Sequence, residues 1–188
     1  DITKPDSTIS SERNATATGI VRLHGELIII LDFEKIVSEI NPETGVKTSD
    51  IDKLGSRERC EKPILIAEDS PMLSKMICNC LVKAGYTTVI PTDNGLEAWE
   101  LLKQFKGEGV LDSKVSCVIT DIEMPQMDGH RLTKLIKSDS AFSHIPVVIF
   151  SSLVNEEMRR KGESLGADAQ LSKPEIGQLV EQIDKLVR

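Results

Sequence analysis

From residue 63 to the end of the chain, short apolar runs alternate with segments in which apolar residues recur every three or four positions. The short runs are apolar on both faces and indicate buried strands, whereas the longer spacing is that of an amphipathic helix. Such strands, each followed by a helix, predict a parallel sheet with helices on both faces. The predicted strands are PILIA (63–67), TTVIP (87–91), KVSCVIT (114–120), PVVIF (146–150) and AQLS (169–172).

The predicted helices have recognisable starts and stops. The first begins at Ser70-Pro71, an N-cap followed by proline in the first helical position, and ends before Gly85. The five apolar stripes are Leu73, Met76, Ile77, Cys80 and Leu81; Leu96, Ala98, Trp99, Leu102 and Phe105; Leu132, Leu135 and Ile136; Met158 and Leu165; and Ile176, Leu179, Val180, Ile183 and Leu186. Five strand-helix units predict an α/β domain.

The segment before residue 60 has a different pattern. GIVRL (19–23) and ELIII (26–30) predict a two-stranded hairpin, and LDFEKIVSEI (31–40) predicts a short helix. Residues 41–61 are rich in turn-forming and charged residues and are interpreted as a linker. Two strands and one helix are too few to bury a stable core alone.

Charge and hydropathy exclude several classes of protein. Residues 1–60 hold 8 Lys/Arg against 11 Asp/Glu, and the remainder holds 15 against 19, so neither part has the basic surface that nucleic-acid binding requires. The longest dense apolar stretch is LIIIL (27–31), far short of the ~20 residues that span a bilayer. The polar start, DITKPDSTIS, is not a signal peptide. We therefore expect a cytoplasmic protein without nucleic-acid binding or membrane insertion.

The cysteines and histidines show no metal-binding pattern. Cys78 and Cys80 would point to different faces of a helix, so a metal clip or local disulfide is not expected. With Cys60 and Cys117 they are interpreted as ordinary thiols of a reducing compartment. The histidines lack paired ligands and are expected to be solvated; they are His24, His130 and His144.

Chemically active side chains stand directly after four of the predicted strands. In parallel sheets, ligands bind at the carboxyl ends of the strands, so these residues are expected to meet at one edge. They are Glu68 and Asp69, then Asp121 and Glu123, then Ser151 and Ser152, and finally Lys173-Pro174.

Carboxylates that converge at one place repel one another unless protons or a divalent cation offset their charge. An all-oxygen site that is open to water and phosphate favours Mg²⁺. A carboxylate beside this ion can attack a phosphoryl group and form an aspartyl phosphate, with Lys173 stabilising the transferring oxygens. Each of these residues, considered alone, also has an ordinary structural interpretation. Asp121 would be a turn residue, Glu68-Asp69 a helix cap and Lys173 a solvated residue at a helix start. Their joint order favours the phosphoryl site.

These motifs resemble the receiver domains of two-component response regulators over residues 62–188. The resemblance is carried by ILIAEDSPMLSKM, VITDIEMPQMDG, VVIFSS and LSKP, in that order. It implies a flavodoxin-like (βα)5 fold with a five-stranded parallel sheet, and a domain that promotes only its own phosphorylation and dephosphorylation. The implied roles are Asp121 as phosphoacceptor, Asp69 as a direct Mg²⁺ ligand, Glu68 as a ligand through water, the backbone carbonyl of Glu123 as a further ligand, Ser151 as switching hydroxyl and Lys173 as phosphate partner, followed by a cis bond to Pro174.

Two positions stand out against this family. Many members have an aromatic residue three positions before the lysine, where this chain has Gln170, so switching by an aromatic side chain is not expected. The side chain of Glu123 also borders the site and is expected to influence water access.

The front segment GIVRLHGELIIILDFEKI resembles the last part of a CheW-like coupling domain. Residues 1–57 are therefore interpreted as a β-rich remnant of that domain plus linker. A coupling domain followed by a receiver is the order of the CheV family of chemotaxis proteins, which implies the histidine kinase CheA and chemoreceptors as partners. Such a coupling domain is longer than the segment present, and the chain does not begin with Met, so a shortened protein is expected.

Two alternatives remain open from the sequence. The first is a phosphotransfer enzyme with an aspartate nucleophile, although these enzymes use an Asp-x-Asp pair and this chain has Glu123 at the second position. The second is a receiver that binds partners without being phosphorylated.

Overall fold

The computed structural model divides the chain into two units, Asp1–Gly45 and Val46–Arg188. It describes residues 2–3, 17–23, 26–31, 57–152, 155–173 and 175–187. Residues 32–40 of the predicted helix, His24 and the peptide bond to Pro174 lie outside the described residues, and Leu31, where that helix was predicted to begin, ends a strand.

The first unit contains a small antiparallel sheet in the order β1-β2-β3. β2 (Ala17–Leu23) pairs with β3 (Glu26–Leu31), with Ile20 opposite Ile29, which confirms the predicted hairpin. β1 (Ile2–Thr3) adds a third strand beside β2 that the sequence pattern did not indicate.

The second unit is built on a five-stranded parallel sheet in the order β5-β4-β6-β7-β8. The strands are β4 (Ile64–Ala67), β5 (Val89–Thr92), β6 (Cys117–Thr120), β7 (Val147–Ser151) and β8 (Ala169–Ser172). Three of them, β4, β6 and β7, are wholly buried, as their continuous apolar sequences require. This architecture confirms the predicted flavodoxin-like fold.

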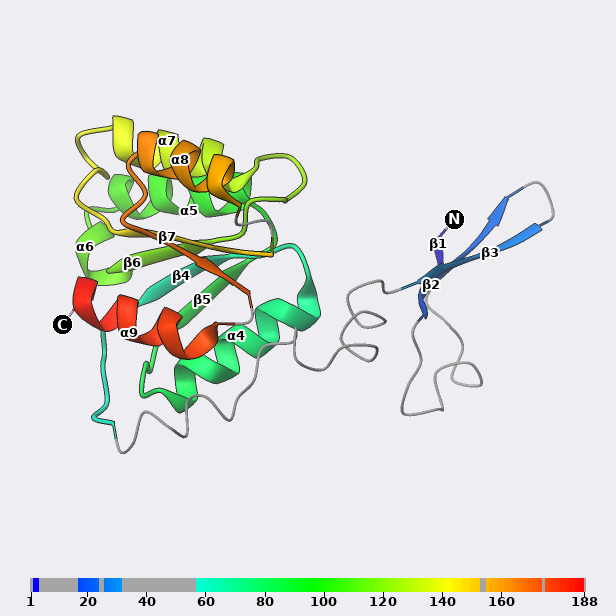
Figure 1. Ribbon diagram of the computed structural model, residues 1–188, viewed down its shortest axis with the longest axis horizontal. Coiled ribbons are helices and arrows are strands. Elements are labelled where there is room, and N and C mark those ends of the chain that lie inside the picture. The colour runs from blue at the N-terminus through cyan, green and yellow to red at the C-terminus, as the bar shows by residue number, and fades with distance from the viewer. Residues whose placement is uncertain are drawn as a thin grey trace. The chain divides into compact units, whose positions relative to one another are not determined.

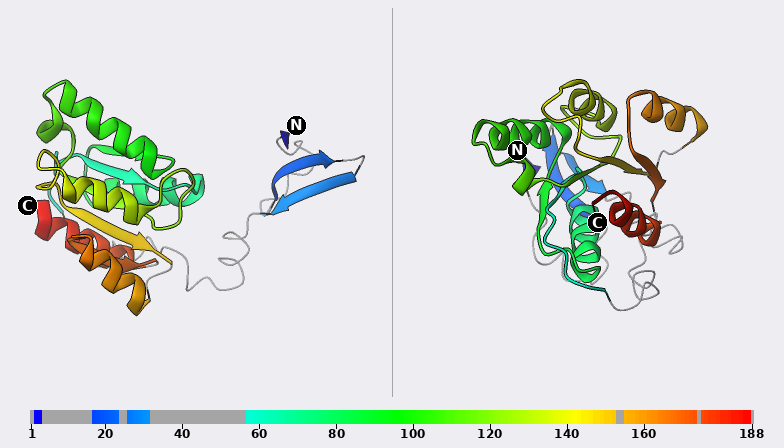
Figure 2. Two further views of the ribbon diagram at one scale, coloured as in Figure 1. Left: turned by 90° about the horizontal axis from the view of Figure 1, so that it is seen from above. Right: turned by 90° about the vertical axis from the view of Figure 1, so that its left-hand side faces the viewer.

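Helices cover both faces of this sheet (Figure 1). They are α4 (Pro71–Lys83), α5 (Gly95–Gly107), α6 (Leu111–Lys114), α7 (Gly129–Ser138), α8 (Glu156–Ser164) and α9 (Ile176–Val187). The short α6 was not predicted. Figure 2 shows α4 and α9 on one face and α5 and α7 on the other.

The two faces are separated by the alternation of side chains along each strand. Ile64 and Ile66 of β4 belong to the core under α4 and α9, whereas Leu65 and Ala67 belong to the core under α5 and α7. Both cores are closed by apolar helix stripes.

The strand order changes direction at β4, which lies between β5 and β6. The carboxyl ends of β4 and β6 therefore form the switch point at which ligands of such sheets bind. Within the described ranges, every helix is too short or too polar to traverse a membrane.

Candidate functional site

Three acidic side chains meet at the switch point. Glu68 and Asp69 follow β4 and Asp121 follows β6, and each offers a carboxylate oxygen within 4.8 Å of the others. Glu68 is 2% and Asp121 8% exposed, whereas Asp69 is open to solvent. Two carboxylates are thus held in the protein and one faces water.

A single ammonium lies between the two buried acids. Lys173 Nζ donates to Glu68 Oε2 at 2.7 Å and to Asp121 Oδ2 at 2.9 Å. The side chain is almost fully buried, and its backbone N–H donates to the carbonyl of Ser151 at 3.1 Å. The carboxyl end of β8 therefore contributes to the same site as the carboxyl ends of β4 and β6.

The charges of this group do not balance. Burial, followed by the charge of Asp121, raises the pKa of Glu68 to about 7, although Lys173 acts in the opposite direction. Burial and Asp121 likewise raise the pKa of Asp69. Burial alone would lower the pKa of Lys173, but the charges of Glu68 and Asp121 outweigh it and raise that pKa. The site therefore carries an excess of negative charge that favours a further cation.

The donor set fits a hard divalent cation. Carboxylate oxygens with one water-facing member are suited to Mg²⁺, which keeps several of its waters. Glu123 lies two residues beyond Asp121 and its side chain is exposed. Its backbone carbonyl as a metal ligand stays a prediction.

The loop after β6 is held in close contact with Asp121. The Ile122 N–H donates to Asp121 Oδ1 at 2.6 Å, and the Gly129 N–H donates to the carbonyl of Ile122 at 3.0 Å. A Cβ added at Gly129 would lie 1.8 Å from the backbone oxygen of Asp121. Only glycine fits there, so the sharp turn of this motif fixes the aspartate.

Ser151 and Gln170 occupy neighbouring strands. Ser151 ends β7, is 2% exposed and pairs in register with Ser172 of β8. Gln170 is 9% exposed, and its Nε2 donates to the carbonyl of Arg159 in α8 at 2.6 Å. The position that is aromatic in many receivers thus holds an amide that ties β8 to α8. The switching role of Ser151 stays a prediction.

The expectation for His130 was wrong. His130 is 3% exposed and bonds the backbone of Met158, because the first turn of α7 packs against α8. Burial, with the nearby charge of Lys161, lowers its pKa. His144 is exposed as expected and lies 2.9 Å from Asp112. This burial could not be predicted from the apolar pattern because His130 shares its helix face with the polar Thr133.

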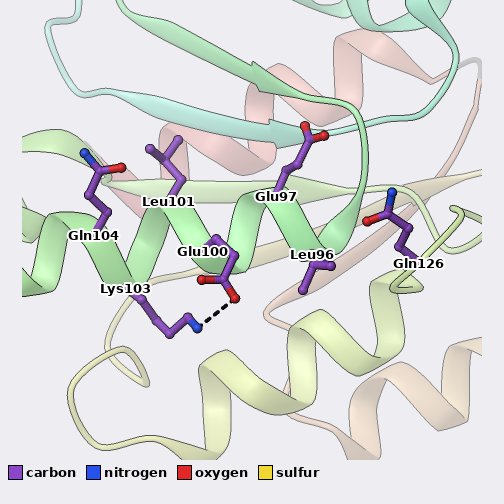
Figure 3. A pocket seen from close by; sticks show the side chains of 7 residues that line it. All are labelled: Leu96, Glu97, Glu100, Leu101, Lys103, Gln104 and Gln126. Atoms are coloured by element: carbon purple, nitrogen blue, oxygen red, sulfur yellow. Dashed lines mark hydrogen bonds and ion pairs between the residues drawn. The ribbon is translucent and has the colours of Figure 1, made fainter.

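A hollow of about 540 Å³ opens beside the acids. Asp69 and Glu123 line it together with His130 and Lys161, so it gives access to the site from solvent. Figure 3 shows a second hollow on the outer face of α5, where Glu100 pairs with Lys103 at 2.7 Å. None of the strand-end residues lines that second hollow.

Comparisons with known proteins agree with this geometry. The chain is 29% identical over 184 residues to chemotaxis protein CheV3 of Helicobacter pylori, covering 96% of this chain but only 58% of that protein. The phosphorylated cyanobacterial phytochrome response regulator RcpA matches with a TM-score of 0.58 and 26% identity, covering 68% of this chain and 94% of that one. The Mn²⁺-bound form of response regulator Rcp1 matches with a TM-score of 0.56 and 25% identity, covering 66% and 92%. The family model of the response regulator receiver domain matches residues 64–184, and the chain belongs to that family.

Proposed function

We propose that the chain is a phosphorylatable signalling module of bacterial chemotaxis, in which Asp121 accepts a phosphoryl group from the phosphohistidine of a kinase such as CheA. The observation that carries this proposal is the buried pairing of Asp121 with Lys173, beside two further acids at the switch point. The similarity to CheV3 over nearly the whole chain supports the chemotaxis setting.

In the proposed step, a carboxylate oxygen of Asp121 attacks phosphorus. An O–P bond forms, the P–N bond of the phosphohistidine breaks, and the leaving imidazole keeps the electron pair and takes up a proton. Lys173 already reaches the attacking carboxylate, so its ammonium is placed to bond the charged phosphoryl oxygens. Bound Mg²⁺, held by Asp69 and Asp121, through water by Glu68, and by the Glu123 carbonyl, would supply the remaining charge neutralisation.

Ser151 is proposed to convert phosphorylation into a change of conformation. The ammonium of Lys173 at ~4 Å contributes at most about 4 kcal/mol at an effective dielectric of ~20. A hydroxyl bonded to the charged group adds roughly 1.5–3 kcal/mol. A full shift between two states takes ~5.5 kcal/mol, so both groups together are needed.

The domain arrangement is part of the proposal. We assign residues 62–188 to the receiver and 1–57 to a CheW-like remnant with its linker, in a cytoplasmic protein. Chemoreceptors and the kinase would be engaged through the coupling part. The chain spans about half the length of the curated CheV relatives it matches, so these partners are proposed for the whole protein.

Mass spectrometry after incubation with Mg²⁺ and acetyl phosphate tests the proposal. We expect one added phosphoryl group in the unaltered chain and none in Asp121→Ala. Asp93→Ala is the matched control, since Asp93 also follows a strand of the sheet but is exposed and outside the acidic group. Incorporation that persists in Asp121→Ala would contradict the assignment.

The same preparation separates the two alternatives. Multiple turnover on a phosphomonoester such as p-nitrophenyl phosphate would favour the phosphotransfer enzyme. A chain that takes up no phosphoryl group and shows no Mg²⁺-dependent response to beryllofluoride would favour a receiver that works without phosphorylation.

A further inference from the structure

The end of the predicted linker is fastened to the receiver. Arg57 Nε donates to the carbonyl of Ala84 at 2.8 Å, and its guanidinium also bonds the carboxylate of Asp184 in α9. The other oxygen of that carboxylate accepts a hydrogen bond from Tyr86 OH at 2.6 Å. We call residues 57–60, with residues 84–87 and Asp184 that hold them, the clasp.

The backbone of the clasp is equally well fixed. Cys60 forms an isolated parallel bridge with Tyr86: its N–H donates to the Gly85 carbonyl at 2.9 Å, and its carbonyl accepts from Thr87 N–H at 3.0 Å. Gly85 has a φ of +99°, and a Cβ there would lie 2.6 Å from the backbone oxygen of Glu58. The backbone of residues 58–60 therefore lies close against Gly85 and pairs with residues 85–87, and Cys60 is only 9% exposed.

One helix joins the clasp to the phosphoryl site. α9 begins at Ile176, three residues after Lys173, and Asp184 lies in its last turn. Its buried stripe packs on the sheet, and its twelve residues span about 18 Å. The clasp is at the amino ends of β4 and β5, whereas the acids are at the carboxyl ends of β4 and β6. A movement of α9 along its axis would thus displace residues at both edges of the sheet.

We propose that the clasp carries the state of the phosphoryl site to the segment before residue 57, an inference that rests on the function proposed above. A phosphoryl group at Asp121 draws Lys173 toward itself and α9 with it. This moves Asp184 away from Arg57 and Tyr86 and loosens the clasp. Because coupling between two sites is reciprocal, a weakened clasp in turn favours the phosphorylated arrangement.

Alkylation of Cys60 in the full chain measures the opening of the clasp. Iodoacetamide is added with or without beryllofluoride and Mg²⁺, and the modified cysteines are assigned by mass spectrometry. Since typical coupling energies correspond to 5–150-fold, we expect beryllofluoride to speed alkylation of Cys60 by about 5-fold. An unchanged or slower rate would overturn the proposal.

Two substitutions and one control localise the effect. In Asp184→Asn, Cys60 should react fast already without beryllofluoride and respond to it less than 2-fold. Tyr86→Phe keeps the ion pair between Arg57 and Asp184. This variant should therefore remain folded and show an intermediate rate of Cys60 alkylation. Glu181→Gln, an exposed position of the same helix, should behave as the unaltered chain. A full response in Asp184→Asn would show that the clasp is not the route.

Occupancy of the site is measured in the same samples by fluorine NMR of bound beryllofluoride, and phosphorylation by intact mass. No binding and no phosphorylation would defeat the proposed function itself. Binding with no acceleration at Cys60 would defeat only the clasp.

Discussion

The carboxyl and amino edges of the parallel sheet, at the two ends of its strands, hold ion pairs that differ in charge balance and in exposure. At the carboxyl edge, Lys173 faces Glu68 and Asp121, and the side chains of Lys173 and Glu68 are only 4% and 1% exposed. At the amino edge, Arg57 faces Asp184, and these side chains are 13% and 22% exposed. The first group has more carboxylates than cations, whereas the second pairs one guanidinium with one carboxylate and adds a phenol.

This difference separates a group with an excess of negative charge from a pair of opposite charges. A group with unbalanced buried charge has free energy to gain from a further cation or from charge removal. A matched pair at partial exposure has little to gain and contributes modestly to stability.

Replacing the basic side chain should lower the free energy of unfolding more at the carboxyl edge than at the amino edge. Lys173→Met leaves two buried carboxylates facing each other, and we expect it to lower the free energy of unfolding by about 3 kcal/mol. Arg57→Met leaves one carboxylate that is 22% exposed and still accepts from Tyr86, and it should lower the free energy of unfolding by about 1–2 kcal/mol. Urea denaturation in Mg²⁺-free buffer measures both. Equal losses would remove the distinction between the two edges.

The close packing of the loop after β6 provides a second test of the carboxyl edge. Gly129→Ala forces a Cβ against the Asp121 backbone and should cost about 2–3 kcal/mol, with loss of Mg²⁺ binding. Gly107→Ala is the matched control in α5, because no atom lies within 4 Å of its added Cβ. That substitution should stabilise by roughly 0.5–1 kcal/mol. Thermal unfolding of both variants provides the comparison, and a harmless Gly129→Ala would mean that the loop is not rigid.

The strand-end chemistry was predictable from the sequence because it follows from topology alone. Every parallel strand delivers the residue after it to the same edge, so Asp121 and Lys173 could be brought together from positions 52 residues apart. The periodicity of the last helix likewise indicated its buried face, whereas α8 buries Gly162 and not the predicted Met158. The fold class and the acidic group needed no knowledge of side-chain packing.

The clasp and the burial of His130 could not be predicted because neither has a local signal. Arg57 meets Asp184 across 127 positions, within a segment whose composition reads as linker. His130 is covered by α8, and the packing of two helices is not encoded in the spacing of one. Gln170 was recognised as a departure from the family, but its bond to the backbone of α8 required the structure.

The pH dependence of stability should report the excess charge at the carboxyl edge. The pKa of Glu68 is raised to about 7 from an ordinary value of 4.5, so between these values the folded protein holds a proton that the unfolded chain has lost. Stability is therefore expected to fall as pH rises from 5 to 7, by roughly 2 kcal/mol. Glu68→Gln should flatten this part of the curve. Urea midpoints measured from pH 5 to 7 without divalent cations test this prediction. A curve that is unchanged by Glu68→Gln would contradict the charge excess.

The smallest effect is expected from the phenol of the clasp. Tyr86 is fully buried, so Tyr86→Phe keeps the packing of its ring and removes only the hydrogen bond to Asp184. Because Arg57 still bonds that carboxylate, no buried charge is left alone, and we expect a loss of about 1 kcal/mol. Double-mutant analysis with Arg57→Met measures how strongly the two partners depend on each other. A coupling energy near zero would mean that Asp184 binds them independently, and that the clasp is two separate contacts rather than one unit.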